Sequence, residues 1–340
     1  MINRVNSYDY LRVFTTYTVV LLHTAAPFLY LYDNIPINTW MIGNTFDSIV
    51  RWCVPVFFML SGAFLLDPSK NDTIIDFFRK RLNKVLIPFI VWTLVYYFYS
   101  VFKHNKENSI EVFIRGFLNN DISNHLWFIY ILIGLYIITP ILRILINNLS
   151  REMLLYFLIV WFVGNSLFDL INFLFEVNIY LDIPIDDYLG FFILGYFIRT
   201  QTISNKITKA VYVLAFFSLL LTILGTYFET VSAGKFVEFY YEYLSPNTVI
   251  VALAVFIFFK NFNPSNHFFS KVVNFFNKRS FGIYLIHILI LNILSDFFGV
   301  NATSYNPLIS IPVISMMTFL LSSISIFILQ KIPLINKIVT

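Results

Sequence analysis

Residues 10–31 read YLRVFTTYTVVLLHTAAPFLYL, an apolar run that contains one arginine, Arg12, and one histidine, His23. The hydrocarbon core of a bilayer is about 30 Å thick, and a helix of about 20 apolar residues crosses it. Backbone groups find no water at that depth, so such a run is expected to be a helix whatever its aromatic and β-branched content. The stretch therefore predicts a transmembrane helix that carries two ionisable side chains.

Composition extends this prediction to the whole chain. Hydrophobic residues make up 58% of the 340 residues and charged residues 12%, whereas soluble domains have about 25% charged residues. These values exclude a soluble enzyme and a disordered segment. Cys53 is the single cysteine of the sequence, so an internal disulfide and a cysteine metal site are excluded as well.

Ten apolar runs predict an all-α, polytopic transmembrane helix bundle of about ten spans. They lie near residues 10–31, 49–66, 85–102, 126–145, 153–174, 188–199, 207–227, 246–262, 281–298 and 309–329. The sixth run would form a helix of about 18 Å, so it is expected to begin earlier or to be a half-span or re-entrant segment. The connections are too short for a soluble domain, and residues 1–340 are expected to form a single membrane domain.

Lys and Arg residues are distributed unequally between the two sides of this predicted bundle. With the N-terminus inside, 18 of the 23 Lys and Arg residues fall on the inner side and 5 on the outer side. Cytoplasmic loops of membrane proteins carry an excess of basic residues. The distribution therefore predicts that the N-terminus and the C-terminus both lie in the cytoplasm.

Arg12 and His23 are the first candidates for function. They are eleven residues apart, which is close to three helical turns and about 16 Å of rise, so both are expected to face one cavity. An ionisable side chain at mid-membrane costs roughly 3 kcal/mol or more and needs a reason. Because histidine ordinarily titrates near neutrality, His23 could be a general base in a partly hydrated channel. The structural alternatives are a neutral His23 hydrogen-bonded to another helix and an Arg12 that snorkels to the interface beside Asp9.

The second predicted span begins with Arg51, on the side where basic residues are scarce. The same run contains Pro55 and ends in Ser61 and Gly62. Proline removes a backbone donor and glycine permits a close helix approach, so these residues suit ordinary packing. The functional alternative is a substrate site that uses Arg51, the Ser61 hydroxyl and freed backbone carbonyls.

The strongest charge cluster follows the second span and comprises Arg79, Lys80, Arg81 and Lys84. A basic run beside a span usually contacts anionic lipid headgroups. The alternative is a cytosolic phosphate clamp for a nucleotide-like donor, because arginine grips phosphate through two hydrogen bonds. The sequence alone favours lipid over phosphate.

Polar and aromatic side chains also occur in the fourth and ninth spans. Trp127, in the segment His125-Leu-Trp-Phe, is expected in the aromatic belt of the outer interface. Tyr284 and His287 lie in the ninth span, with His287 about 10 Å inside its cytoplasmic end. A satisfied interhelical hydrogen bond is the structural alternative for His287. The sequence contains neither a His/Cys spacing typical of metal sites nor a nucleotide-binding glycine loop.

These motifs, in this order, resemble the integral-membrane acyltransferase-3 family, the bacterial O-acyltransferases that modify cell-surface glycans. The matching segments are Tyr8-Asp-Tyr-Leu-Arg12 followed by His23, Val54-Pro-Val-Phe-Phe-Met-Leu-Ser-Gly62, Arg81 leading to Pro88, His125-Leu-Trp-Phe, and Ser280-Phe-Gly-Ile-Tyr-Leu-Ile-His287. They extend from the first span to the ninth, and the chain is similar to the stand-alone branch of the family. One position departs from the pattern, because Lys84 stands where a second arginine is common, and lysine lacks the planar fork that grips phosphate.

The resemblance implies transfer of an acyl group, usually acetyl, from cytosolic acyl-CoA to a hydroxyl of a polysaccharide or lipid-linked glycan at a bacterial cell membrane. His23 and Arg12 are then the catalytic candidates, and His23 would act on the acceptor hydroxyl or first on the thioester. The other candidates are Arg51, Ser61, Trp127, Tyr284 and His287 for substrate and Arg79, Arg81 and Lys84 for acyl-CoA. Membrane lipids are further expected partners, and a homo-oligomer is left open. No nucleic acid, metal or permanently bound cofactor is expected.

The competing hypothesis is a transporter, either a polysaccharide exporter or a small-solute permease. Intramembrane His and Arg residues would serve it as proton-coupling or substrate groups. A helix broken at Pro55 and a short sixth span would suit this function. The sequence shows no obvious inverted repeat, and the order of the motifs favours the enzyme.

Overall fold

The computed structural model describes residues 6–67, 69, 72–105, 107–179, 187–263, 267–333 and 335–339, and within them it contains helices and no strand. The α-helices are α1 (Ser7–Ala25), α2 (Ile37–Ser48), α3 (Cys53–Leu65), α4 (Ile74–Arg81), α5 (Ile87–His104), α6 (Ile110–Leu118), α7 (Trp127–Asn148), α8 (Arg151–Phe162), α9 (Phe168–Phe175), α10 (Asp187–Thr200), α11 (Asn205–Ala233), α12 (Pro246–Asn261), α13 (His267–Asn277), α14 (Ser280–Phe298), α15 (Pro307–Leu329) and α16 (Asn336–Val339). Short 3₁₀ or π segments adjoin them: η1 (Ala26–Asn34), η2 (Leu82–Leu86), η3 (Asn124–Leu126), η4 (Val163–Leu167), η5 (Phe239–Tyr241) and η6 (Ala302–Ser304).

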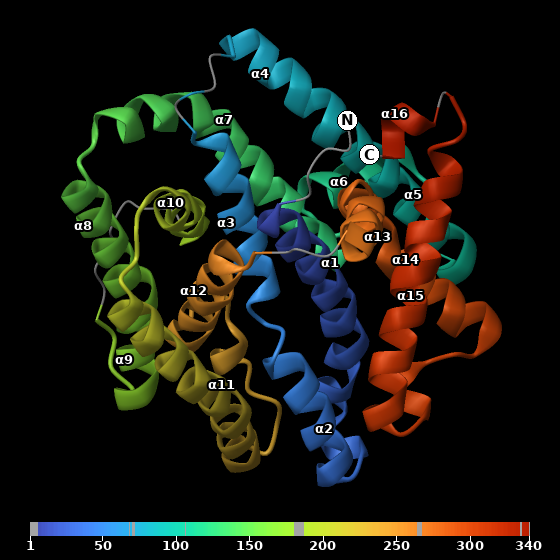
Figure 1. Cartoon of the computed structure of the whole chain (residues 1–340). Coiled ribbons are helices and arrows are strands. Elements are labelled where there is room, and N and C mark those ends of the chain that lie inside the picture. The colour runs from blue at the N-terminus through green and yellow to red at the C-terminus, as the bar shows by residue number, and fades with distance from the viewer. Residues whose placement is uncertain are drawn as a thin grey trace.

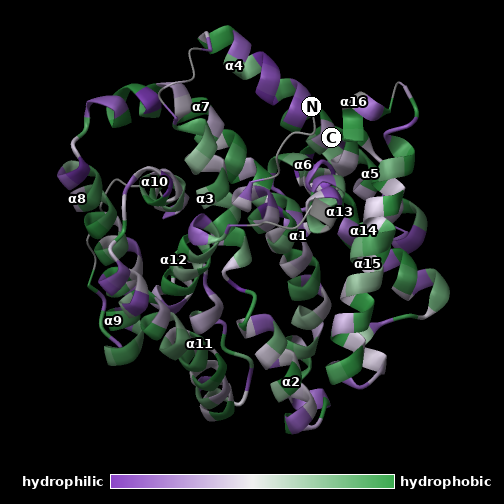
Figure 2. Ribbon diagram, in the orientation of Figure 1, coloured by the Kyte–Doolittle hydropathy of each residue, from purple (hydrophilic) through white to green (hydrophobic). Residues whose placement is uncertain are grey.

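Nine segments of the described chain are long and apolar enough to cross a membrane. They are Ser7–Asn34, Ile37–Leu65, Ile74–His104, Asn124–Asn148, Arg151–Phe175, Asn205–Ala233, Phe239–Asn261, Ser280–Phe298 and Pro307–Leu329. Apolar residues cover most of these helices in Figure 2, whereas polar residues are prominent on α4. The predicted all-α polytopic bundle is therefore confirmed.

The second span differs from the prediction, because it begins at Ile37. It consists of α2 and α3, with a turn at residues 49–52 between them. Pro55 explains this turn, since proline has no N–H to donate to the carbonyl four residues earlier, that of Arg51, and its ring clashes with that carbonyl. Arg51 therefore lies at a break inside the span, and the prediction that it opens the span is wrong.

The polar composition of α2 explains why the sequence pattern missed this helix. Asn44, Asp47 and Ser48 lower its hydropathy, yet all three side chains are buried in the bundle. Hydropathy measures transfer into lipid, whereas α2 faces other helices, where polar groups find partners. A membrane helix enclosed by protein can thus carry several polar residues.

The sixth predicted span, 188–199, corresponds to α10, a helix of 14 residues. Its length is about 21 Å, which is short of the bilayer core. Residues 190–198 are all buried, so protein surrounds this helix, and Figure 1 views it nearly along its axis while α1 and α15 run up the picture. An earlier start of the helix would fall in residues 180–186, which lie outside the described residues.

Two glycines allow α10 to cross α3 closely. A Cβ atom on Gly62 would lie 1.7 Å from the carbonyl oxygen of Phe192, and one on Gly195 would lie 1.9 Å from that of Met59. Any larger residue at either position would push the two helices apart. Gly62, at the end of the second span, thus has a packing function, as small residues often have between membrane helices.

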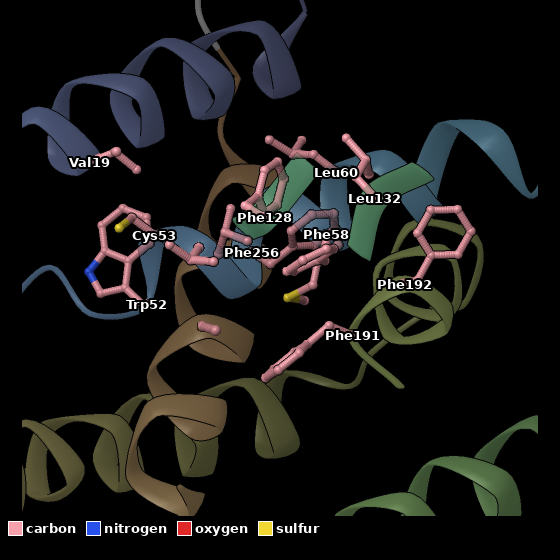
Figure 3. Packing of buried hydrophobic residues seen from close by; sticks show 14 of the residues in the cluster. Val19, Trp52, Cys53, Phe58, Leu60, Phe128, Leu132, Phe191, Phe192 and Phe256 are labelled. Carbon is pink, nitrogen blue, oxygen red and sulfur yellow. The ribbon is translucent and has the colours of Figure 1, made fainter. Parts of the chain in front are cut away.

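The helix α3 occupies the centre of the bundle, where it packs against α1, α7, α10 and α12. Aromatic residues fill the spaces around it, and Figure 3 shows the rings of Phe58 and Phe128 against each other, with centroids 4.5 Å apart. Phe191 and Phe256 are fully buried in the same core. This packing fixes α3, and with it the positions of Arg51 and Ser61.

The start of α1 and the short helix α16 lie at one end of the bundle (Figure 1). The α16 helix packs on η2 and α5, and the side chains of Arg12 in α1 and Lys84 in η2 line one cavity. The first and last described helices, α1 and α16, therefore lie on the same side of the candidate spans. That this side is the cytoplasm stays a prediction from the distribution of Lys and Arg.

Candidate active site

Three histidines from three separate elements meet inside the bundle. His23 lies in the last turn of α1, His125 in η3 and His287 in α14. The ring centroids of His23 and His287 are 5.2 Å apart, those of His125 and His287 5.2 Å, and those of His23 and His125 6.3 Å. His125 and His287 are buried, whereas His23 is partly exposed. We call these three side chains the histidine cluster.

Local structure holds two of the three rings in place. Nδ1 of His125 lies 2.9 Å from the hydroxyl oxygen of Ser123, and Nδ1 of His287 lies 2.6 Å from the carbonyl oxygen of Tyr284. The Nε2 atoms of both rings are buried and have no hydrogen-bond partner among the described residues. In that part of the chain no group of three His, Cys, Asp or Glu side chains is arranged to hold a metal ion. The cluster therefore offers two unpaired ring nitrogens beside His23.

A basic cavity of about 520 Å³ lies between α1, α3, η2, α7 and α14. Four cationic side chains line it: Arg12, Arg81, Lys84 and Lys278. Its aromatic lining residues are Phe57, Phe128, Tyr136, Phe281 and Tyr284. The volume lies in the range typical of small-molecule sites. Positive charge and aromatic surface in one cavity suit a ligand with phosphate groups and an apolar arm.

Arg12 is held at this cavity by polar contacts. Its Nη1 atom donates to Oδ1 of Asn277 over 2.9 Å and lies 3.5 Å from a carboxylate oxygen of Asp9. The guanidinium of Arg81 lies over the rings of Phe77 and Tyr136, 5.6 Å from each centroid. Nε of Arg81 is buried and has no partner among the described residues. Both arginines keep donors available for a ligand.

Tyr284 contacts both the basic cavity and the histidine cluster. Its ring lines the cavity and its centroid lies 5.7 Å from that of His125 and 5.9 Å from that of His287. Its hydroxyl donates to the carbonyl oxygen of His125, and its own carbonyl accepts from His287. One residue thus contacts both the basic cavity and the histidine cluster.

The basic cavity is lined by Arg12 and not by His23, so a cavity shared by the two residues, expected from their helical spacing, stays a prediction. His23 contacts the other two histidines. Helical periodicity predicted a common face for the two residues, but it could not show that Tyr284 of a distant span contacts both the cavity and the cluster. The two compartments are joined through this tyrosine.

A buried ion pair lies near the break between α2 and α3. Nε of Arg51 pairs with Oδ1 of Asp47, and the guanidinium carbon lies 4.2 Å from the centre of the Tyr241 ring. The hydroxyl of Ser48 donates to that of Tyr241 over 3.1 Å. The helix α2, which carries Asp47, packs against α1, which carries His23. The Asp47–Arg51 pair and the hydroxyls of Ser48 and Tyr241 thus form a polar group inside the bundle.

The other predicted site residues fall in different places. Ser61 and Lys84 line the basic cavity, whereas Arg79 is exposed and is not part of its lining. Trp127 does not line it either, and its ring stacks on that of Tyr243 with centroids 5.6 Å apart. His287 belongs to the histidine cluster. The substrate roles of these side chains stay predictions.

The sequence reasoning missed two residues of the site. His125 was recognised as part of a motif at the start of the fourth span, but its place beside His23 and His287 depends on packing between distant spans. The available signal was a histidine directly before the fourth apolar run. Asn277, which contacts Arg12, lies in a connection between spans and carried no signal of its own.

One comparison with known proteins gives a match. A family model described as an acyltransferase domain matches residues 5–327 of the chain. This range contains every predicted and observed site residue discussed above, from Asp9 to His287. No curated protein and no solved structure matches the chain.

Proposed function

The chain belongs to the acyltransferase-3 family and is a multi-pass membrane acyltransferase, and from this premise we propose that it transfers an acyl group, usually acetyl, from acyl-CoA to a hydroxyl of a cell-surface polysaccharide or lipid-linked glycan. The proposal further assigns the chain to the cytoplasmic membrane of a bacterium. We assign the end of the bundle where Arg12 and Lys84 lie to the cytoplasmic side of that membrane.

The basic cavity is the proposed donor site. Coenzyme A carries several phosphates, and the cavity presents the cations Arg12, Arg81, Lys84 and Lys278. Arginine can bind phosphate through two hydrogen bonds, whereas a lysine contributes a point charge. The apolar pantetheine arm would extend along the aromatic residues to Tyr284, so that the thioester approaches the histidine cluster. Ser61, in the same lining, would contact this arm.

His23 is the proposed general base. It is the partly exposed member of the histidine cluster, which suits a side chain that meets an acceptor. His23 takes the proton of the acceptor hydroxyl, the hydroxyl oxygen attacks the thioester carbonyl carbon, and the carbon–sulfur bond breaks. Coenzyme A leaves as the thiolate and is then protonated, so the reaction yields an ester and free coenzyme A.

We assign roles to the other predicted site residues from the residues that surround them. Arg51 and Trp127, with the neighbouring Asp47 and Tyr243, would hold the sugar, because sugars bind to aromatic faces and to charged hydrogen-bonding groups. Arg79 is exposed outside the basic cavity, so it suits contact with anionic lipid headgroups rather than with the donor.

The observation that carries the proposal is the position of Tyr284. This residue lines the cationic cavity and also contacts two of the three histidines. A phosphate-bearing donor and a hydroxyl acceptor could therefore approach one point from opposite sides. A transporter would need a continuous path for its cargo, whereas an acyltransferase needs only the acyl group to reach Tyr284.

Membranes from cells that express the chain provide the test. Radiolabelled acetyl-CoA is added, and the label in envelope glycan is measured for the wild type, for His23→Ala and for His104→Ala, a matched change of an exposed histidine. General-base catalysis contributes about 10² to 10⁴ in rate, so His23→Ala should lose that factor and His104→Ala should not. Equal labelling by His23→Ala and the wild type would contradict the assignment of His23.

A further inference from the structure

A general base works best when a second group fixes its ring and its tautomer. His23 lies against two side chains that could do so, His287 and His125. The centroid of the His23 ring is 5.2 Å from that of His287 and 6.3 Å from that of His125. Two imidazoles joined by an N–H···N bond of ordinary length have centroids about 5 to 5.5 Å apart. The distance therefore selects His287.

The hydrogen bond on the other side of His287 determines its tautomer. Nδ1 lies 2.6 Å from the carbonyl oxygen of Tyr284. A carbonyl oxygen can only accept, so Nδ1 carries the proton, and Nε2 of the neutral ring keeps its lone pair. Nε2 is buried and has no partner among the described residues. A buried acceptor of this kind is available to an N–H group of the adjoining His23 ring.

Resting on the proposed function, we propose that His287 is the positioning residue of His23. Its Nε2 atom, which has no partner among the described residues, would accept the N–H of His23 during the reaction, and this would leave the lone pair of the other His23 nitrogen for the acceptor hydroxyl. When His23 takes the hydroxyl proton, its ring becomes positively charged, and the His287 lone pair stabilises that charge. His287 itself touches neither substrate.

The environment explains why an imidazole would take a role that carboxylates usually have. In catalytic triads an Asp or Glu orients the histidine. A carboxylate buried in a membrane bundle is costly unless it is paired, and the buried carboxylate of Asp47 is already engaged by Arg51. A neutral imidazole orients the base without adding a second buried charge.

Two substitutions of His287 separate its two nitrogens. The amide of asparagine lies near the position of Nδ1, so His287→Asn can keep the bond to Tyr284 but removes the acceptor at Nε2. The longer glutamine places its amide oxygen near the position of Nε2, so His287→Gln can still accept from His23. His125→Asn and His125→Gln are the matched control variants on the other neighbouring histidine.

The experiment measures the maximal transfer rate and the KM for radiolabelled acetyl-CoA in membrane vesicles that contain the endogenous glycan, together with the amount of folded protein. We expect His287→Asn to lower the maximal rate about 10- to 100-fold, less than the full contribution of a general base. His287→Gln should lose less than about 10-fold, and both should keep the wild-type KM, because His287 does not line the basic cavity.

Several results would overturn this inference. They are a wild-type rate in His287→Asn or equal rates in His287→Asn and His287→Gln. A loss of transfer that is explained by a smaller amount of folded protein, or by a raised KM for acetyl-CoA, would overturn it as well. Rescue by glutamine at position 125 instead of position 287 would assign the role to His125. A wild-type chain that transfers no acetyl group would contradict the proposed function itself, and the positioning of a base would fall with it.

Discussion

Removing one partner of the buried Asp47–Arg51 pair should destabilise the chain strongly. The Asp47 side chain is 0% exposed and that of Arg51 16% exposed, so either charge left alone would lack most of its hydration. Breaking a buried pair in this way costs about 3 to 5 kcal/mol, whereas replacing both partners by apolar residues of similar size is often neutral. Asp47→Leu and Arg51→Met should each lower the free energy of unfolding by about that amount, and the double variant should recover most of it.

Denaturant unfolding in mixed micelles measures these free energies. The matched control is the exposed pair Arg115–Glu111, whose side chains are 72% and 75% exposed. Such surface pairs contribute about 0 to 1 kcal/mol, so Glu111→Gln should have a small effect. A loss below about 1 kcal/mol in both Asp47→Leu and Arg51→Met would refute the reasoning, since it is the value of an exposed pair.

The double variant also separates stability from substrate binding. If Arg51 contacts the acceptor sugar, Asp47→Leu/Arg51→Met should be stable and yet transfer acyl groups slowly. A stable double variant with the wild-type transfer rate would restrict the pair to a structural role.

Two further predictions concern the ends of the bundle and the donor site. On a Cys53→Ser background, a cysteine at position 235 should react with a membrane-impermeant reagent added to intact cells, and one at position 80 should not; the reverse pattern would invert the orientation. Arg81→Gln should raise the KM for acyl-CoA about 10- to 150-fold, the loss of one charge-assisted hydrogen bond. Arg79→Gln should change it less than about twofold, because Arg79 is exposed outside the cavity; equal effects of the two changes would move the donor phosphates elsewhere.

Hydropathy predicted most of the spans, because lipid-facing helices follow a rule of length and composition. It failed at α2, whose buried Asn44, Asp47 and Ser48 face other helices rather than lipid. It also left the nature of α10 open, since a helix of 14 residues enclosed by protein is not subject to the bilayer length. Where protein rather than lipid surrounds a segment, a hydropathy pattern says little about its position.

The candidate site, like the spans, could be predicted from the sequence only in part. Rarity of ionisable residues in apolar runs was enough to select Arg12, His23 and His287, because each such residue needs a reason to be there. The cluster of His287 and His125 with His23, and the position of Tyr284 beside the basic cavity, arise from packing between spans far apart in the sequence. A single sequence contains no record of those contacts.

The central claim is that acyl-CoA enters the basic cavity from the cytoplasmic end and that its acyl group passes Tyr284 to the histidine cluster. Sealed inside-out and right-side-out membrane vesicles that contain the endogenous glycan test it most directly, with radiolabelled acetyl-CoA added outside. We expect labelled glycan in inside-out vesicles, none in right-side-out vesicles until they are permeabilised, and a labelling rate lowered about 10²- to 10⁴-fold for His23→Ala in inside-out vesicles. Labelling of intact right-side-out vesicles at the same rate as inside-out vesicles would contradict it.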